Sequence, residues 1–166
     1  MMPVSIRTLL RVIALVGMTS TVACSDSLSP GSGVIGTPSD PAKETFAAAL
    51  GINLAAMTRK SDVLYIQDLV VGAGAEAVAG RTLGMVYSGW LANGTKFDSN
   101  VGGANFSFAL GAGQVVGGWD QGILGMKVGG KRRIIMGSAL GYGASGSGPV
   151  PPNATLVFDV ELKTLQ

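Results

Sequence analysis

The chain has 166 residues, of which 47% are hydrophobic, 13% are charged and 26 are glycine, and its formal net charge is +2. This length accommodates one domain with an appendage, and abundant glycine among apolar residues favours short strands joined by tight turns over a helical bundle. The chain has no histidine and one cysteine, which excludes Ser-His-Asp and Cys-His catalysis, histidine-ligated zinc and an internal disulfide.

The N-terminal residues follow the plan of an export signal. Arg7 and Arg11 flank or enter an apolar stretch over residues 9–18, and small residues follow it. This stretch is shorter than the about 20 apolar residues that span a bilayer, so we expect a signal peptide over residues 1–23 and not a membrane anchor. Removing its two arginines from the 12 basic residues leaves ten against 10 acidic ones, so the exported protein is expected to be nearly neutral.

The only cysteine, Cys24, directly follows the run Thr-Val-Ala. This run resembles the lipobox of bacterial lipoproteins, and the resemblance implies cleavage before Cys24 and attachment of lipid to it. Thr21 departs from the leucine usual at its position, so ordinary cleavage after Ala23 is the alternative. A lipid on Cys24 would be the chain's one attachment to a membrane. It would place the exported protein in the cell envelope, facing the periplasm or the exterior.

Two segments separate this signal from the predicted domain. Residues 24–42 are rich in Ser, Gly and Pro, which predicts a flexible tether. Residues 43–61 form a short N-terminal extension with apolar residues at helical spacing, although a central glycine, Gly51, weakens the pattern. The extension is predicted to be a short helix on the domain or one that forms transiently, and its apolar residues are Phe46, Leu50, Leu54 and Met57.

The pattern of residues 62–166 is that of one domain built from short strands. Strands are predicted within residues 63–72, 106–111, 131–137 and 154–165, and Asn93-Gly94 is the strongest short-range signal for a hairpin between two more. In two of these strands apolar residues recur with a period of two, as is typical of strands with one buried face. The residues that share a face are Leu83, Met85, Tyr87 and Leu91 in the first, and Leu156, Phe158, Val160 and Leu162 in the second.

One helix is predicted in this domain, within residues 118–130. Trp119, Ile123 and Met126 stack at helical spacing, and Asp120 lies in the first turn, where the helix dipole favours an anion. Strands of this kind around one helix predict an α+β domain with an antiparallel sheet.

Two further motifs do not indicate ligand sites. Residues 72–77, Gly-Ala-Gly-Ala-Glu-Ala, fit a dinucleotide-binding fingerprint, but the next strand follows too soon for the helix that such a site requires. The basic run at residues 131–133 is too short for a nucleic-acid footprint, and we interpret it as the solvated start of a strand.

Three blocks resemble, in order, the FKBP-type peptidyl-prolyl cis-trans isomerases. They are "VYSGWLANGTKFDS", "FSFALGAGQVVGGWDQGILGMKVGGKRRIIM" and "GYGASGSGPVPPNATLVFDVEL". The resemblance implies an α+β fold in which an antiparallel sheet of five to six strands curls around one short helix. It also implies an apolar cleft formed by Tyr87, Phe97, Asp98, Phe106, Val115, Val116, Trp119, Tyr142 and Phe158, with Val150 covering a bound proline.

Roles for these residues follow from the same resemblance. It implies that Trp119 is the floor beneath the proline ring, that Tyr142 offers its hydroxyl to a substrate carbonyl, and that the Val116 N–H makes a further hydrogen bond. Asp98 lines the wall, and we hypothesise that it pairs with a neighbouring hydroxyl such as that of Tyr87. Taken singly, the aromatic residues could be ordinary core; their joint occurrence favours the cleft.

The predicted activity is rotation of X–Pro bonds in exported proteins, which breaks no covalent bond and requires no cofactor or metal. The expected partners are proline-containing unfolded polypeptides and macrolides such as tacrolimus, with no nucleic acid and with the chain as a monomer. Residues 100–105 and 145–149 are shorter than the corresponding loops of common members, which leaves sequence preference and macrolide affinity open. The alternative function is an FKBP-like binding or chaperone module with little turnover.

Overall fold

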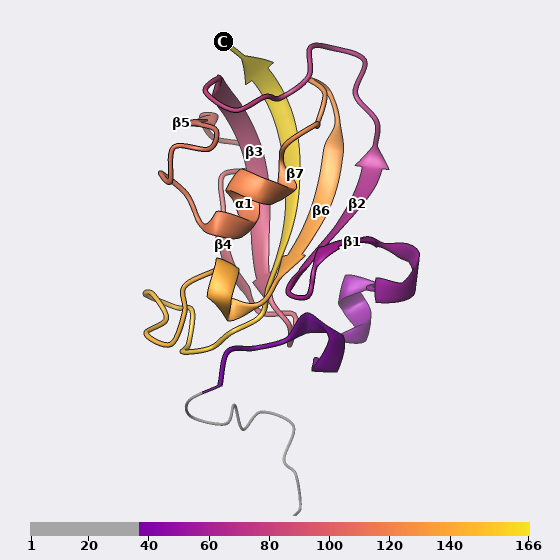
Figure 1. Cartoon of the computed structure of the whole chain (residues 1–166), viewed down its shortest axis with the longest axis vertical. Coiled ribbons are helices and arrows are strands. Elements are labelled where there is room, and N and C mark those ends of the chain that lie inside the picture. Colours follow the sequence, from indigo (N-terminus) through magenta and orange to yellow (C-terminus); the bar gives the residue numbers. More distant parts are fainter. Residues whose placement is uncertain (1–36) are drawn as a thin grey trace, which may run out of the picture. The chain divides into compact units, whose positions relative to one another are not determined.

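An antiparallel sheet of seven strands organises residues 37–166, which are the residues that the computed structural model describes (Figure 1). The strands lie in the order β1-β2-β6-β7-β3-β4, and β5 also pairs with β3. Their bounds are β1 Thr58–Ser61, β2 Leu64–Val70, β3 Thr82–Leu91, β4 Lys96–Ser99, β5 Phe106–Ala109, β6 Lys131–Met136 and β7 Leu156–Leu165. The predicted α+β class is confirmed, and β1 raises the strand count because the extension joins the sheet.

The predicted signal peptide, Cys24 and the tether up to residue 36 lie outside the described residues. The end of the predicted tether, residues 37–42, differs from the expectation of a flexible segment. Pro41 is buried there and begins a 3-10 turn, Pro41–Lys43. In the described part of the chain, no helix combines the length and apolar character needed to cross a membrane.

The α1-side core fills the face of the sheet covered by α1, the helix Gly117–Gly122 (Figure 1). The predicted alternation is confirmed, because Leu83 and Met85 of β3 and Leu156 and Val160 of β7 are all buried in this core. Its buried members are Leu64, Ile66, Ala77, Leu83, Met85, Phe108, Leu110, Trp119, Ile123, Met126, Ile134, Met136, Val150, Leu156, Phe158, Val160 and Leu162.

Helix α1 is shorter than predicted, because only six residues are helical. Ile123 and Met126 nevertheless remain buried beyond its end. Glycines allow the helix to approach β6 closely: a Cβ at Gly122 would lie 3.1 Å from Ile134, and one at Gly118 would collide with Met136. The placement of α1 therefore depends on both glycines.

The extension-side core fills the opposite face, where the predicted helix is wrong. Residues 48–56 form two 3-10 turns, Ala48–Leu50 and Leu54–Ala56. Gly51 adopts a left-handed φ of 58° and ends the first turn, and the Asn53 side chain caps the second by accepting from the Ala55 N–H. The apolar residues of the extension still gather, because Leu50 and Met57 join Tyr65, Ile135 and Val157, with Phe46, Leu54 and Trp90 packed against them.

The basic run at the start of β6 is solvated only at Lys131, and its two arginines are not solvated as predicted. The Arg132 side chain binds Asp68 of β2 through both carboxylate oxygens, at 2.7 and 3.1 Å, and Arg132 is only 6% exposed. Arg133 points to the other face and binds Asp159 of β7 in the same two-pronged way, at 2.6 and 2.8 Å. A planar guanidinium can bridge two neighbouring strands in this manner, which a lysine cannot.

Two turn predictions are confirmed. Asn93 and Gly94 lie in the β3–β4 hairpin, where Gly94 has a φ of 87° and the Asn93 side chain accepts from the Thr95 N–H. The stretch over residues 72–77 opens no helix. A Cβ at Gly74 would collide with Val128, so the glycines there serve close packing against the loop before β6.

Candidate functional site

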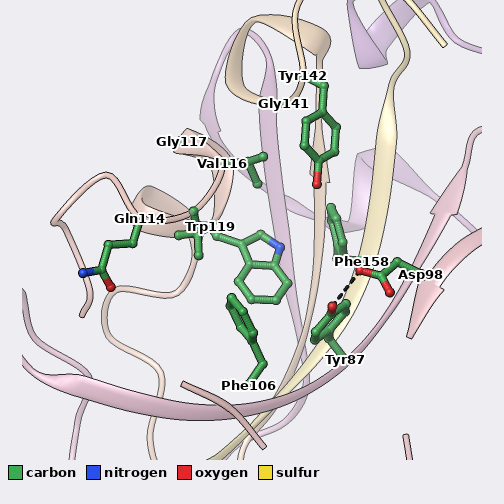
Figure 2. A pocket seen from close by; sticks show the side chains of 11 residues that line it. Tyr87, Asp98, Phe106, Gln114, Val116, Gly117, Trp119, Gly141, Tyr142 and Phe158 are labelled. Atoms are coloured by element: carbon green, nitrogen blue, oxygen red, sulfur yellow. Dashed lines mark hydrogen bonds between the residues drawn. The ribbon is translucent and has the colours of Figure 1, made fainter. Parts of the chain in front are cut away.

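A cavity of about 610 Å³ opens beside α1, between β3, β4 and the turn that precedes β7 (Figure 2). It is bounded by aromatic rings, by two valines and two glycines, and by the polar residues Asp98 and Gln114. The lining residues are Tyr87, Asp98, Phe106, Gln114, Val115, Val116, Gly117, Trp119, Gly141, Tyr142 and Phe158.

Trp119 of α1 lies at the centre of an aromatic cluster. Its ring meets Tyr87 and Phe158 edge to face, with centroids 5.1 and 5.3 Å apart, and Phe106 likewise at 6.1 Å. Such edge-to-face contacts are the preferred aromatic geometry. Trp119 is buried at 4% exposure, and its Nε1 has no hydrogen-bond partner among the described residues. The cluster therefore presents a rigid apolar surface to the cavity.

The predicted bond between Tyr87 and Asp98 is present: the Tyr87 hydroxyl donates to Asp98 Oδ2 over 2.6 Å (Figure 2). Asp98 Oδ1 accepts from the Ser99 N–H over 2.8 Å, so the carboxylate is held on both sides. Burial, the bond to Asp98 and its negative charge raise the pKa of Tyr87 above the ordinary range. Tyr87 therefore remains a neutral donor to Asp98.

Tyr142 lies on the opposite wall, with its hydroxyl directed toward Asp98 and the cavity (Figure 2). It follows a 3-10 turn, η4 Ser138–Leu140, and it is 37% exposed. Burial first, and the negative charge of Asp98 second, raise the pKa of Tyr142. Its hydroxyl is therefore available as a neutral donor to a group in the cavity.

The start of α1 supplies a backbone donor. Val116 caps the helix, and its carbonyl accepts from the Trp119 N–H over 2.9 Å. The Val116 N–H itself makes no hydrogen bond to another residue in the described range, and Val116 lines the cavity. Asp120 in the first turn accepts from the N–H groups of Gly111 and Gly113, so it ties the preceding loop to the helix.

Two predicted cleft residues do not line the cavity. Phe97 lies behind it and packs edge to face on Phe158, with centroids 5.4 Å apart. Val150, predicted to cover a bound proline, is instead a core residue at 4% exposure. Its N–H and carbonyl pair with Ser147, which folds the Gly/Pro loop inward and takes the side chain with it.

Three lining residues were missed from the sequence. Gly117 and Gly141 contribute only backbone, so no side-chain pattern could reveal them. Gln114 turns its amide toward β5, where Oε1 accepts from the Ala109 N–H over 2.9 Å. Only its position in the sequence, directly before Val115 and Val116, could have indicated that Gln114 lines the cavity.

Comparison with known proteins identifies this arrangement. The family model of the FKBP-type peptidyl-prolyl cis-trans isomerases matches residues 74–163, more than half of the chain. The chain belongs to the FKBP-type isomerase family. It is accordingly a peptidyl-prolyl cis-trans isomerase, as the three sequence blocks predicted.

Individual relatives match a longer stretch of this chain than the family model does. The FK506-binding protein of Neisseria meningitidis serogroup B is 54% identical over 101 residues, which are 60% of this chain and 93% of that protein. The crystal structure of FkpA from Escherichia coli superposes with a TM-score of 0.62 at 35% identity, covering 67% of this chain and 52% of that one. For the crystal structure of AtFKBP13 the TM-score is 0.59 at 38% identity, covering 62% and 93%.

Proposed function

We propose that the cavity holds the proline ring of a substrate on Trp119 while Tyr142 and the Val116 N–H bind the carbonyls beside it. The observation that carries this proposal is that an aromatic floor, the Tyr142 phenol and Val116, whose N–H has no partner among the described residues, line the same cavity. Phe106, which is exposed, and the buried Phe158 supply the adjoining apolar walls.

Such a site favours the transition state of amide rotation. The planar X–Pro amide is polar through resonance, and its barrier to rotation is about 20 kcal/mol. At the twisted transition state the resonance is lost and the carbonyl and nitrogen are less charge-separated. The aromatic surface around Trp119 disfavours the polar planar amide relative to the twisted one, and this difference in binding accelerates rotation.

Asp98 has a supporting role in this proposal. Both of its oxygens are engaged, one by Tyr87 and one by the Ser99 N–H. It therefore fixes the Tyr87 ring against Trp119 and adds negative charge near the Tyr142 hydroxyl, and it transfers no proton. No covalent bond forms or breaks at any step.

We further propose that the substrates are exported polypeptides. This rests on the sequence alone: the predicted signal peptide over residues 1–23 and the lipobox-like run before Cys24. A lipid on Cys24 would hold the enzyme in the cell envelope. The name of the Neisseria relative suggests that macrolides such as FK506, or tacrolimus, occupy the same cavity here.

The test is the cis-to-trans rate of a short Leu-Pro peptide, catalysed by the chain from Ser25 onward. Trp119→Ala is expected to lower kcat/KM by roughly tenfold or more, equivalent to at least about 1.4 kcal/mol of lost transition-state binding. Trp90→Ala is the matched control, because Trp90 packs in the extension-side core away from the cavity. Tyr142→Phe is expected to lower kcat/KM with a smaller effect than Trp119→Ala.

The alternative is an FKBP-like module that binds chains without turnover. It would be favoured if the folded protein accelerated no peptide but bound proline-containing peptides, with Trp119→Ala abolishing that binding. Equal loss of activity in Trp119→Ala and Trp90→Ala would contradict the assignment of the cavity.

A further inference from the structure

The turn that carries Tyr142 is held by a residue far away in the sequence. The Ser39 N–H donates to Ser138 Oγ over 2.9 Å, and the Ser138 N–H donates to Ser39 Oγ over 2.8 Å. Ser138 is 1% exposed, so water does not compete effectively for these bonds. We call this reciprocal pair the serine latch.

Ser138 links the serine latch to Tyr142 directly. Its carbonyl accepts from the N–H groups of Gly141 and Gly143, over 3.0 and 2.9 Å, and these are the residues on either side of Tyr142. Ser138 thus uses its N–H and hydroxyl on Ser39 and its carbonyl on the turn. Any displacement of Ser138 moves both amides that flank Tyr142.

Neighbouring contacts hold the two segments of the serine latch next to each other. Gly137 lies so close to the Ser39 carbonyl that a Cβ would collide with it, and the Gly137 N–H donates to the Val63 carbonyl over 2.8 Å. Farther along, Thr155 Oγ1 donates to Glu44 Oε1 over 3.2 Å. The N-terminal part of the described chain therefore contacts the Tyr142 segment both where that segment leaves β6 and where it enters β7.

We propose that Ser39 is a positioning residue for catalysis, acting through Ser138 to hold the Tyr142 hydroxyl at the cavity. The inference rests on the proposed role of Tyr142 and adds to it a residue that precedes the matched family region, residues 74–163. The residues that support the Tyr142 turn therefore include one from outside the matched region.

The test compares serine variants in the chain from Ser25 onward. Ser39→Ala removes one latch bond and is expected to lower kcat/KM about fivefold, the factor that one lost buried hydrogen bond implies. Ser39→Thr keeps the hydroxyl and is expected to restore most of the activity. Ser61→Ala is the matched control, since Ser61 is exposed in β1 and its side chain makes no hydrogen bond to another described residue. Urea unfolding gives the folded fraction of each variant, so that kcat/KM is compared at equal concentrations of folded protein.

A double-mutant cycle with Tyr142→Phe shows whether Ser39 acts through that residue. The expected result is that Ser39→Ala lowers kcat/KM in the wild-type background and has almost no further effect in Tyr142→Phe. Hydrogen exchange at the Gly143 amide is expected to be faster in Ser39→Ala and unchanged in Ser61→Ala.

Two results would overturn the proposal while leaving the role of Tyr142 intact. One is unchanged kcat/KM in Ser39→Ala beside reduced kcat/KM in Tyr142→Phe, and the other is the same fivefold loss in both backgrounds. Unchanged kcat/KM in Tyr142→Phe itself would instead remove the proposed role of Tyr142, and the positioning role of Ser39 with it.

Discussion

The two faces of the sheet carry covers of different kinds. On one face, α1 is a single short helix seated on glycines, and the aromatic rings around Trp119 are left partly open as a cavity. On the other face, 3-10 turns of the extension lie across the strands and leave a small closed core around Ile135 and Val157. A short helix covers only part of its sheet face and leaves space for a ligand beside it. The irregular turns instead follow the other face and pack against it, without such a cavity among the described residues.

Strand β6 secures both covers by the same device. Arg132 binds Asp68 and donates to the carbonyls of Gly122 and Leu124 at the end of α1, over 2.8 and 3.1 Å. Arg133 binds Asp159 and donates to the Leu50 carbonyl of the extension over 2.6 Å. Adjacent residues point to opposite faces, so one dipeptide fixes two covers. The two arginines differ in burial, because the Arg132 side chain is less exposed than that of Arg133.

The largest expected effects come from the next pair along β6, Ile134 and Ile135, both fully buried and one in each core. Replacing either with alanine is expected to lower the free energy of unfolding by about 2–5 kcal/mol. Only Ile134→Ala is expected to lower kcat/KM of the folded protein severalfold, because Ile134 packs under Gly122 of α1. Urea unfolding and the peptide assay measure both quantities.

If an alanine variant does not fold, the milder Ile→Val pair, which costs about 0.5–1.5 kcal/mol, allows the same comparison. Equal changes in kcat/KM for the two positions would show that the extension-side core supports the cavity as much as the α1-side core does.

A smaller difference is expected between Arg132→Met and Arg133→Met. Arg132→Met leaves the carbonyls of Gly122 and Leu124 without their buried donor and is expected to cost about 3 kcal/mol of unfolding free energy. Arg133→Met, where the arginine side chain is more exposed, is expected to cost about 1.5 kcal/mol. Unfolding at low and high salt is the measurement, and the Arg133 bond should be the more salt-sensitive of the two. A reversed order would contradict the importance given to burial.

The smallest expected effect is that of pH on kcat/KM, through the two tyrosines of the cavity. The pKa values of Tyr87 and Tyr142 are raised, so the folded state favours the neutral phenols. Their contribution to stability is present below the ordinary tyrosine pKa of about 10 and is lost as pH rises through the folded-state values. We therefore expect kcat/KM to be nearly constant from about pH 7 to 10. The measurement is a pH profile of kcat/KM, together with the ultraviolet absorbance of tyrosinate as a readout of phenol ionisation. A fall in activity within this range that is absent from Tyr142→Phe would contradict this.

Much of the α1 side was predictable because its residues obey simple periods. Alternation in β3 and β7 placed Leu83 and Leu156 correctly, and the spacing of Trp119 and Ile123 marked the helix face. The bond between Tyr87 and Asp98 was also predicted, because a carboxylate among aromatic rings needs a donor.

The extension side was predicted poorly because local and long-range preferences conflict there. Phe46, Leu50 and Leu54 have helical spacing, but Gly51 and Asn53 favour turns, and packing on the sheet needs burial and not a helix. The guanidinium of Arg132 was interpreted as solvated because its partner Asp68 lies 64 positions away in the sequence. Val150 was misplaced for a similar reason, since its loop folds back onto the core.

The position of β7 in the sheet has a consequence for when the protein can fold. This strand, Leu156–Leu165, is the last of the seven described strands and yet lies between β6 and β3, with which it pairs over nearly its whole length. Without β7, strand β6 pairs only with β2, and β3 only with β4 and β5, so the sheet is divided into two parts. Both cores also lack their β7 residues, such as Leu156 and Val157. Because pairing between strands far apart in the sequence forms slowly, we expect closure of the sheet by β7 to be a late step in folding.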